Sequence, residues 1–418
     1  RFSIFICLQA LLFASILEPI SVALVRISFE EDSTNSTTGN GQFLLVNEGT
    51  DCGSYTIDPP PHDYNYFLSQ LHAVNHYFEN VSYGKFGIDL AQSSIYPSSL
   101  NGNYQLSNTM DFYNPYDDPL GQEEKLTKLF KDAIEQSYSE DAIEFSKYDL
   151  VVVFHAGIGQ DFSLPFLDPT PEDIPSTYID EDMIQEHLGE SNIIVGNHAI
   201  QKGIILPETQ NHLLYDISET MFSDADNPCE YQYGITGTFS LMIGFAIGLP
   251  PLWNIQTGES GVGVFGLMDQ GSNNGRGIIP APPTAWSRIY AGWENYVIGE
   301  LGSEYHIPTR SENSIIKVPI REDEYYLIES RSNWIKPKVS IDSLRYEIGS
   351  SSSSNLYPPY IEILIDSSGL ERDSNGVFTF VPNYDIGLPE SGLLIWHIDE
   401  AIISDGIFSY SINSGLLN

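Results

Sequence analysis

Two histidines four residues apart, His72 and His76, form the first pair in this 418-residue sequence whose spacing could support chemistry. They fall in a stretch with helical periodicity, so both would lie on one helix face and could chelate a metal ion. Ala73 stands where a glutamate base would follow the first histidine, and no third ligand accompanies the pair. We therefore favour two unrelated histidines on a partly exposed helix over a metal site.

A second candidate polar site consists of His155 and Asp161, which follow the apolar stretch Tyr148–Phe154. Ligands of open α/β sheets bind at the carboxyl ends of the strands. The glycines between the two side chains would allow a ligand or another segment of backbone to approach closely. A new polar site is one interpretation. A histidine hydrogen-bonded in a tight turn after the strand is the interpretation that we favour.

A third pair, His397 and Asp399, lies in an alternating stretch near the end of the sequence. Alternation would place both side chains on the same face of a strand. They could contact the rest of the chain or a cation, and ordinary polar packing at a sheet edge is slightly preferred.

An acidic segment from Asp168 to Asp182 makes calcium a possible cofactor, because calcium prefers clustered oxygen ligands. The sequence contains no EF-hand loop, and the spacing of these carboxylates is irregular. The candidate ligands are Asp168, Glu172, Asp173, Asp180, Glu181 and Asp182.

The charge of the chain restricts its partners. It has 57 Asp and Glu residues against 18 Lys and Arg residues, a net charge of -39. Nucleic-acid binding requires cationic surface, so we expect no nucleic-acid partner. Anionic membrane surfaces are disfavoured for the same reason. An affinity for cations and a simply solvated acidic surface both remain, and we favour the second.

The N-terminal residues predict export. Ile4–Leu17 is an apolar run, and Ser21–Ala23 has the small-x-Ala pattern of a signal-peptide cleavage site. We expect residues 1–23 to be a signal peptide and the protein to be secreted, either extracellular or periplasmic, with no membrane span after its removal. Cys52 and Cys229 could then pair in an oxidising compartment, or both could remain free thiols.

The remaining sequence divides near residue 305. Residues 24–305 have the apolar patterns of an α/β domain, and residues 306–418 have those of a β-rich segment that we expect to be truncated. The predicted helices are Tyr64–Glu79, Gly121–Gln136 and Gly234–Leu249. The predicted strands are Leu24–Phe29, Phe86–Leu90, Tyr148–Phe154, Ser314–Pro319, Glu324–Glu329, Tyr360–Ile365 and Gly392–Ile398. The predicted loops are Glu31–Gln42, Asp161–Glu190 and Ser350–Ser354.

One stretch, Gly237–Asn254, carries a resemblance to a known family. With Gly266–Gly271, Pro283–Trp286 and Gly292-Trp293 it resembles the active-site region of the immune inhibitor A-type (M6) zinc peptidases. There a helix carries His-Glu-x-x-His, followed by x-x-Gly-Leu-Pro-Asp-Leu-Tyr-Asp and a Met-containing turn. Further stretches are similar to the family's sequences, and their order and spacing match over nearly the whole mature chain. These stretches are Thr37–Phe43, Tyr77–Lys85, Glu324–Arg331 and Leu388–Glu400.

The resemblance places apolar residues where the family has its catalytic groups. Aligned on Gly248-Leu249-Pro250, the two histidine positions hold Leu241 and Phe245, the general base position holds Met242, and the third-ligand position holds Pro251. Zn²⁺ requires nitrogen, sulfur or oxygen donors, which Leu, Phe and Pro side chains lack, and a thioether cannot act as a base. The scaffold around these positions is retained: Gly248, Pro250, Trp253, Met268 of the Met turn, and Trp286.

The resemblance implies a zincin-like peptidase domain, α/β (α+β) with a mixed sheet and a helix of the active-site type, followed by the β-rich segment. It implies a secreted, non-catalytic member of the family (a pseudopeptidase) that binds a peptide or protein ligand without zinc. The alternative is an active secreted metallopeptidase or hydrolase that uses ligands elsewhere, for example around His155 and Asp161. Whether the chain is an enzyme stays open at this point.

Overall fold

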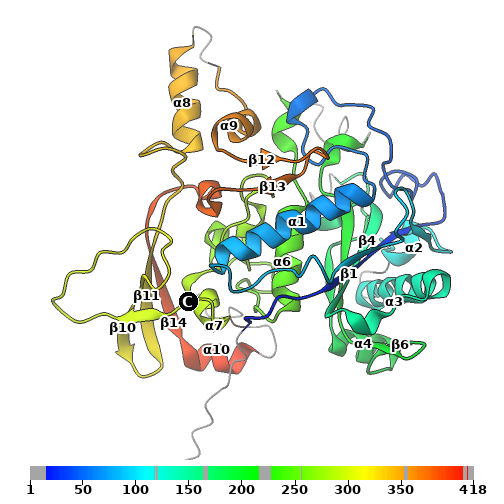
Figure 1. Ribbon diagram of the computed structural model, residues 1–418, viewed down its shortest axis with the longest axis horizontal. Coiled ribbons are helices and arrows are strands. Elements are labelled where there is room, and N and C mark those ends of the chain that lie inside the picture. The colour runs from blue at the N-terminus through cyan, green and yellow to red at the C-terminus, as the bar shows by residue number, and fades with distance from the viewer. Residues whose placement is uncertain are drawn as a thin grey trace, which may run out of the picture.

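A six-stranded sheet forms the centre of this mixed α/β fold (Figure 1). The computed structural model describes residues 16–116, 118, 121–162, 168–215, 227–255, 257–352, 356–407 and 412. The strand order is β2-β1-β4-β8-β5, with β3 also paired to β1. Neighbouring strands are parallel except for β5, the edge strand, which is antiparallel to β8. The strands are β1 (Val22–Ser28), β2 (Ser94–Tyr96), β3 (Tyr104–Gln105), β4 (Leu150–Ile158), β5 (Thr177–Ile179) and β8 (Gly203–Thr209).

Helices cover both faces of this sheet, which explains why its central strands are apolar without alternation. Every residue of β1 and β4 is buried. On one face Val152 and Phe154 pack with α1 and α6, and on the other Val151 and Val153 pack with α2, α3 and α4 (Figure 1). The predicted mixed sheet is therefore confirmed. The helices are α1 (Tyr64–Val81), α2 (Met110–Tyr113), α3 (Gln122–Asp141), α4 (Glu181–Leu188) and α6 (Thr236–Ala246).

The C-terminal part builds a second sheet with the order β14-β11-β10-β9. Its buried side chains, such as Leu327, belong to the same apolar cluster as α1 and α6. The strands are β9 (Tyr296–Ile298), β10 (Ile315–Arg321), β11 (Glu324–Arg331) and β14 (Gly392–Asp399). They are accompanied by helices α7 (Ala285–Tyr290), α8 (Ile341–Ser351), α9 (Tyr360–Ser367) and α10 (Glu400–Gly406). Two small pairs complete the fold: β12 (Glu371–Arg372) with β13 (Phe378–Phe380), and β6 (Ile193–Val195) with β7 (His198–Ile200).

Most of the predicted elements are present, but the strand predicted at Tyr360–Ile365 is wrong, because these residues begin helix α9. The alternating letters resemble a strand, yet Pro359 stands at the N-cap of the helix. Ile361 and Leu364 then lie three residues apart on its buried side.

Three other sequence predictions need correction. The segment predicted as the loop Asp161–Glu190 contains β5 and helix α4, whose N-cap Asp180 accepts a hydrogen bond from the Met183 backbone. Phe86–Leu90 contributes only an isolated bridge between Ile88 and Ile20. In the predicted loop Ser350–Ser354, α8 extends to Ser351, and residues 353–355 lie outside the described residues.

Cys52 and Cys229 form a disulfide across 177 residues of sequence, which decides between the two alternatives left open for these thiols. The predicted cleavage site after Ala23 falls inside β1, and residues 1–15 of the predicted signal peptide lie outside the described residues. In the part of the chain that the structure describes, no helix has the length and apolarity needed to cross a membrane.

Five charged side chains, each at most 3% exposed, lie where α7, β11 and the 384–387 turn meet; we call them the buried ion cluster. The Arg288 guanidinium of α7 donates to Glu294 (2.7 Å) and to Glu329 of β11 (2.8 Å). Arg331, two residues further along β11, donates to Asp385 (2.7 Å). The cluster therefore fixes α7 and the 384–387 turn against β11.

Glu329 is the centre of the buried ion cluster. Burial raises the pKa of its carboxyl, but Arg288 and Arg331 outweigh burial and hold the pKa at about 2, below the ordinary 4.5. The same carboxylate accepts a hydrogen bond from the Trp396 indole of β14 (2.8 Å). Because its pKa is lower in the folded chain, Glu329 stabilises the fold fully above about pH 4.5. This contribution is lost as the pH falls toward 2.

Replacing Glu329 by Gln leaves two buried guanidinium groups with too little negative charge around them. We expect the free energy of unfolding at pH 7 to fall by about 3–5 kcal/mol in urea denaturation. The loss of stability between pH 4.5 and 2 should also become shallower. The control is Glu322→Gln, an exposed position in the same hairpin, which should unfold like the native protein. Equal effects of the two substitutions would contradict the role of Glu329.

Candidate functional site

Helix α6 carries three of the four positions where the resemblance predicts lost catalytic groups, and the fourth, Pro251, lies in the chain that follows it. Its N-terminus is held by the buried Asp58 carboxylate, which accepts a hydrogen bond from the Ile235 backbone (2.9 Å). Its side chain Phe239 packs edge-on against Phe154 of β4, with ring centres 5.3 Å apart. A mostly apolar helix is stable in this place because it is covered by the sheet and by α1.

The turn after α6 depends on one glycine. Gly248 has φ +91°, a backbone conformation that is unfavourable for any residue other than glycine. This conformation turns the chain at the end of the helix. The chain then passes through Pro250 and Pro251, and the Leu252 backbone donates to the carbonyl of Met268 (2.8 Å).

Met268 is fully buried directly beneath α6. A Cβ at Gly244 would lie 2.6 Å from the Met268 sulfur, so the helix and the methionine are in tight contact. The glycine turn and the methionine of the motif therefore form one packed unit with α6.

Leu241 and Phe245 stand at the two positions where the family motif has histidines. Both side chains are partly buried, and apolar side chains surround them. The Phe245 ring stacks on Tyr178 of the edge strand β5 (ring centres 6.1 Å apart) and meets Trp253 edge-on (5.6 Å). Met242 is buried on the same helix. The described residues contain no group of three or more His, Cys, Asp or Glu side chains that could hold a metal ion.

His72 and His76 do not converge on a common point of binding. His72 is exposed, whereas the His76 ring packs against Phe380 of β13 and its Nε2 lies 3.0 Å from the carbonyl oxygen of Val381. His76 thus fastens α1 to the chain at the end of β13.

His155 and Asp161 each have other partners. The His155 ring is fully buried with Nδ1 2.8 Å from the Ala156 carbonyl oxygen, and burial lowers its pKa to about 4. The Asp161 carboxylate accepts hydrogen bonds from Ser176 and Gln210, and burial raises its pKa. The pair therefore forms two separate packing interactions, and no observation on the described residues favours a hydrolytic site there.

A buried carboxylate that the sequence analysis missed, Glu208, ends strand β8 beside this region. It lies 2.6 Å from Nδ1 of His62 and accepts hydrogen bonds from the Gly157 backbone (2.8 Å) and the Tyr215 hydroxyl (2.7 Å). A glutamate directly after the apolar run 203–207 was the available signal. Because these partners come from the segment before α1, from the end of β4 and from the segment after β8, Glu208 holds the three segments together.

Asp180, Glu172 and Asp173 of the acidic segment 168–182 each have separate hydrogen-bond partners. Asp180 caps α4, and Glu172 accepts a hydrogen bond from the Tyr116 backbone (2.9 Å). Asp173 is fully buried and accepts hydrogen bonds from the backbone (2.7 Å) and hydroxyl of Thr38. Burial raises the pKa of Asp173 to about 7.

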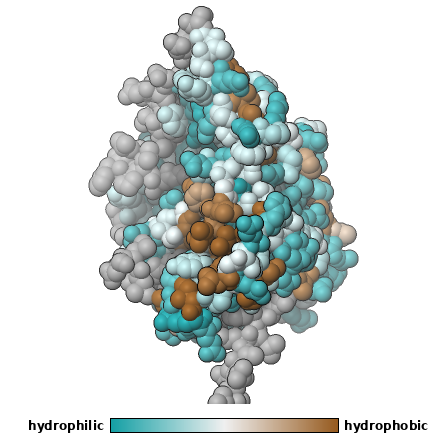
Figure 2. Space-filling model, turned by 90° about the vertical axis from the view of Figure 1, so that its left-hand side faces the viewer, coloured by the Kyte–Doolittle hydropathy of each residue, from teal (hydrophilic) through white to brown (hydrophobic). Residues whose placement is uncertain are grey.

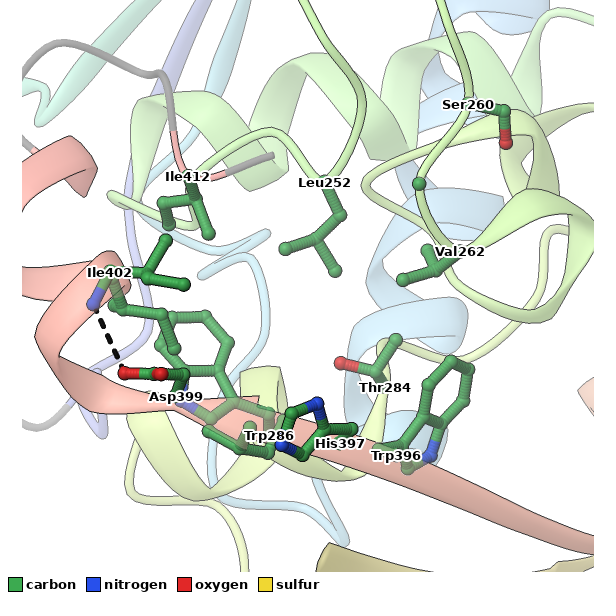
Figure 3. A pocket seen from close by; sticks show the side chains of 13 residues that line it. Leu252, Ser260, Val262, Thr284, Trp286, Trp396, His397, Asp399, Ile402 and Ile412 are labelled. Carbon is green, nitrogen blue, oxygen red and sulfur yellow. Dashed lines mark hydrogen bonds between the residues drawn. The ribbon is translucent and has the colours of Figure 1, made fainter. Parts of the chain in front are cut away.

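His397 and Asp399 lie on one side of β14 and line a cavity of about 470 Å³, which we call the seam pocket. In Figure 3, Leu252 and Val262 stand on one side of the open space, and Trp286, His397 and Trp396 stand on the other. The pocket is thus formed jointly by the chain that follows α6, by α7 and by the C-terminal sheet. Its remaining lining residues are Ser260, Gly261, Thr284, Ile398, Asp399, Ile402, Ile403 and Ile412.

The exposed face of the C-terminal sheet carries apolar side chains. Leu393 and Ile395 of β14 are 59% and 61% exposed, and Tyr326 of β11 lies on the same face. Figure 2, which looks at this side of the molecule, shows the apolar side chains gathered in one region. His397 belongs to this face as well, because it stands two residues after Ile395 and its ring lies 5.3 Å from that of Tyr326. The face therefore borders the seam pocket at His397, whereas Leu393 and Ile395 do not line the pocket.

Comparison of the sequence with protein-family models found no match. Comparison with curated proteins also found none. The functional argument therefore depends on the residues and their geometry.

Asp173 provides a pH-dependent test of how the acidic segment is used. Its pKa is higher in the folded chain than the ordinary 3.8, so its ionisation destabilises the fold as the pH rises from about 4 through 7. We expect Asp173→Asn to raise the free energy of unfolding at pH 8 by about 1 kcal/mol or more. The gain should disappear at pH 4, as measured by urea denaturation.

The control for this prediction is Asp182→Asn, an exposed position in α4 that should not change the pH dependence. Calcium that stabilises the native protein but not the Asp173→Asn variant would contradict this assignment and indicate a calcium site.

Proposed function

We propose that the chain is a secreted, non-catalytic relative of the immune inhibitor A-type (M6) zinc peptidases that binds a peptide or protein ligand. The observation that carries the proposal is the arrangement around α6. A glycine turn and a buried methionine accompany a helix whose Leu241 and Phe245 occupy the two metal-binding positions of the family motif. Apolar side chains at these positions leave zinc without ligands.

Peptide binding is the activity that such an arrangement could retain. β5 is the edge strand of the sheet, antiparallel to β8, and its Tyr178 contacts Phe245 of α6. An edge strand can align an extended peptide by backbone pairing, while neighbouring side chains select its residues. The Cys52–Cys229 disulfide is compatible with an exported protein, since disulfides persist in oxidising compartments.

Restoring the missing groups tests the proposal directly. The restored variant carries Leu241→His, Met242→Glu, Phe245→His and Pro251→Asp, the residues of the family motif. We expect it to bind one zinc ion per chain in a competition titration, because two histidines at i and i+4 and a third ligand would then converge. Zinc should also raise its unfolding midpoint. The native protein should bind no zinc and should not cleave casein.

A matched variant that keeps Phe245 and carries the other three changes lacks the histidine pair, so it should bind zinc at least about tenfold more weakly than the restored variant. Stoichiometric zinc and chelator-sensitive proteolysis in the native protein would overturn the proposal. This result does not depend on whether either variant folds.

A further inference from the structure

We infer that the seam pocket is a binding site for one large apolar or aromatic side chain of a basic peptide. The inference deepens the proposed peptide-binding function and rests on it, because it names where the ligand is held and what it is made of. The cavity of about 470 Å³ is within the range of roughly 300–1,000 Å³ in which ligand sites lie. It is distinct from the face of α6 that carries Leu241 and Phe245, neither of which lines it.

The walls of the seam pocket are suited to an apolar group. Leu252, Val262, Ile402 and the two tryptophans surround most of the space, and a few polar groups lie among them (Figure 3). Burying an aromatic or branched side chain in such surroundings contributes about 1.5–3 kcal/mol, enough for a tenfold or larger preference over alanine.

Two walls of the seam pocket are held in place by hydrogen bonds. The Trp396 indole donates to Glu329 of the buried ion cluster (2.8 Å). Thr284 caps α7, accepting from the Ser287 backbone (3.2 Å), and so fixes the helix that carries Trp286. A pocket whose walls are fixed in advance loses little conformational entropy when it binds.

A third wall, the 260–263 loop, is wrapped around the Asp269 carboxylate. Oδ2 of Asp269 accepts hydrogen bonds from the backbone of Gly261 (2.9 Å), Val262 (2.7 Å) and Gly263 (2.9 Å), and from the Ser260 hydroxyl (2.8 Å). Four donors on one oxygen hold this loop in a single conformation. The loop therefore presents Val262 to the cavity without further ordering.

The charge around the pocket selects basic ligands. Asp399 lies in its lining, with one oxygen capping α10 through the Ala401 backbone (3.0 Å). The Glu324 carboxylate lies 2.7 Å from Nε2 of His397. Arg321 is the neighbouring cation, and Glu324 and Asp399 both pair with it. With a net charge of -39 on the whole chain, acidic peptides are repelled and basic peptides are attracted before contact.

The test uses the full chain and three fluorescein-labelled peptides, Lys-Lys-Phe-Lys-Lys, Lys-Lys-Ala-Lys-Lys and Glu-Glu-Phe-Glu-Glu, measured by fluorescence anisotropy. We expect the first peptide to bind at least about tenfold more tightly than the second, and the third not to bind. Ile402→Trp places a larger side chain at the pocket from a position that is 37% exposed. It should remove the preference for Phe over Ala. Ile395→Trp, at an exposed position of β14 that does not line the pocket, should bind like the native protein.

The possible outcomes separate this inference from the proposed function. If the preference for Phe survives in Ile402→Trp but is lost in Phe245→Ala, the ligand binds beside α6. The seam pocket is then overturned, while peptide binding stands. If none of the three peptides binds the native protein, the seam pocket is overturned as a site for basic peptides. The zinc titration of the native and restored proteins still decides whether the chain is a pseudopeptidase.

Discussion

Everything around the candidate site depends on one constraint: helix α6 is enclosed by the central sheet, α1 and the Met268 turn. An ionisable group in such a place is costly unless a metal ion or a hydrogen-bonding partner compensates for its desolvation. In a zinc peptidase the metal provides that compensation. Without it, leucine, methionine and phenylalanine at positions 241, 242 and 245 are the stable choice, and the contact of Phe245 with Tyr178 and Trp253 shows how the space is filled.

The buried ion cluster solves the opposite problem. Arg288, Glu329 and Asp385 come from three different elements, and each charge is buried with a partner of opposite sign. The arrangement orders α7, β11 and the 384–387 turn relative to one another, and through Trp396 it also fixes one wall of the seam pocket. A single set of buried charges thus connects the stability of the C-terminal sheet with the shape of the seam pocket.

Local patterns of apolar residues in the sequence predicted much of this fold. The apolar run at 234–249 and the helical periodicity from Tyr64 identified α6 and α1, and the unbroken apolar stretch before His155 identified β4. The strand predicted at Tyr360–Ile365 is wrong because the prediction relied on an alternation of period two. The preceding proline and the burial of one helical face favour helix α9 instead.

The candidate site was less predictable, because its decisive contacts join distant residues. Nothing in the sequence distinguishes Glu329, held by Arg288 from 41 residues away, from the many exposed carboxylates of this acidic chain. Asp173 and Glu208 became recognisable only once the loops were placed around them. By contrast, the turn at Gly248 belongs to a short local motif, so the sequence could indicate it.

The most direct test of the central claim is an anomalous difference map at the zinc absorption edge, from crystals of the native protein grown with excess zinc. The account predicts no peak beside Leu241, Phe245 and Pro251, and side chains of these residues packed as apolar neighbours. A fully occupied zinc peak at that position would contradict it, because the metal would then have ligands that the apolar side chains of this helix cannot supply.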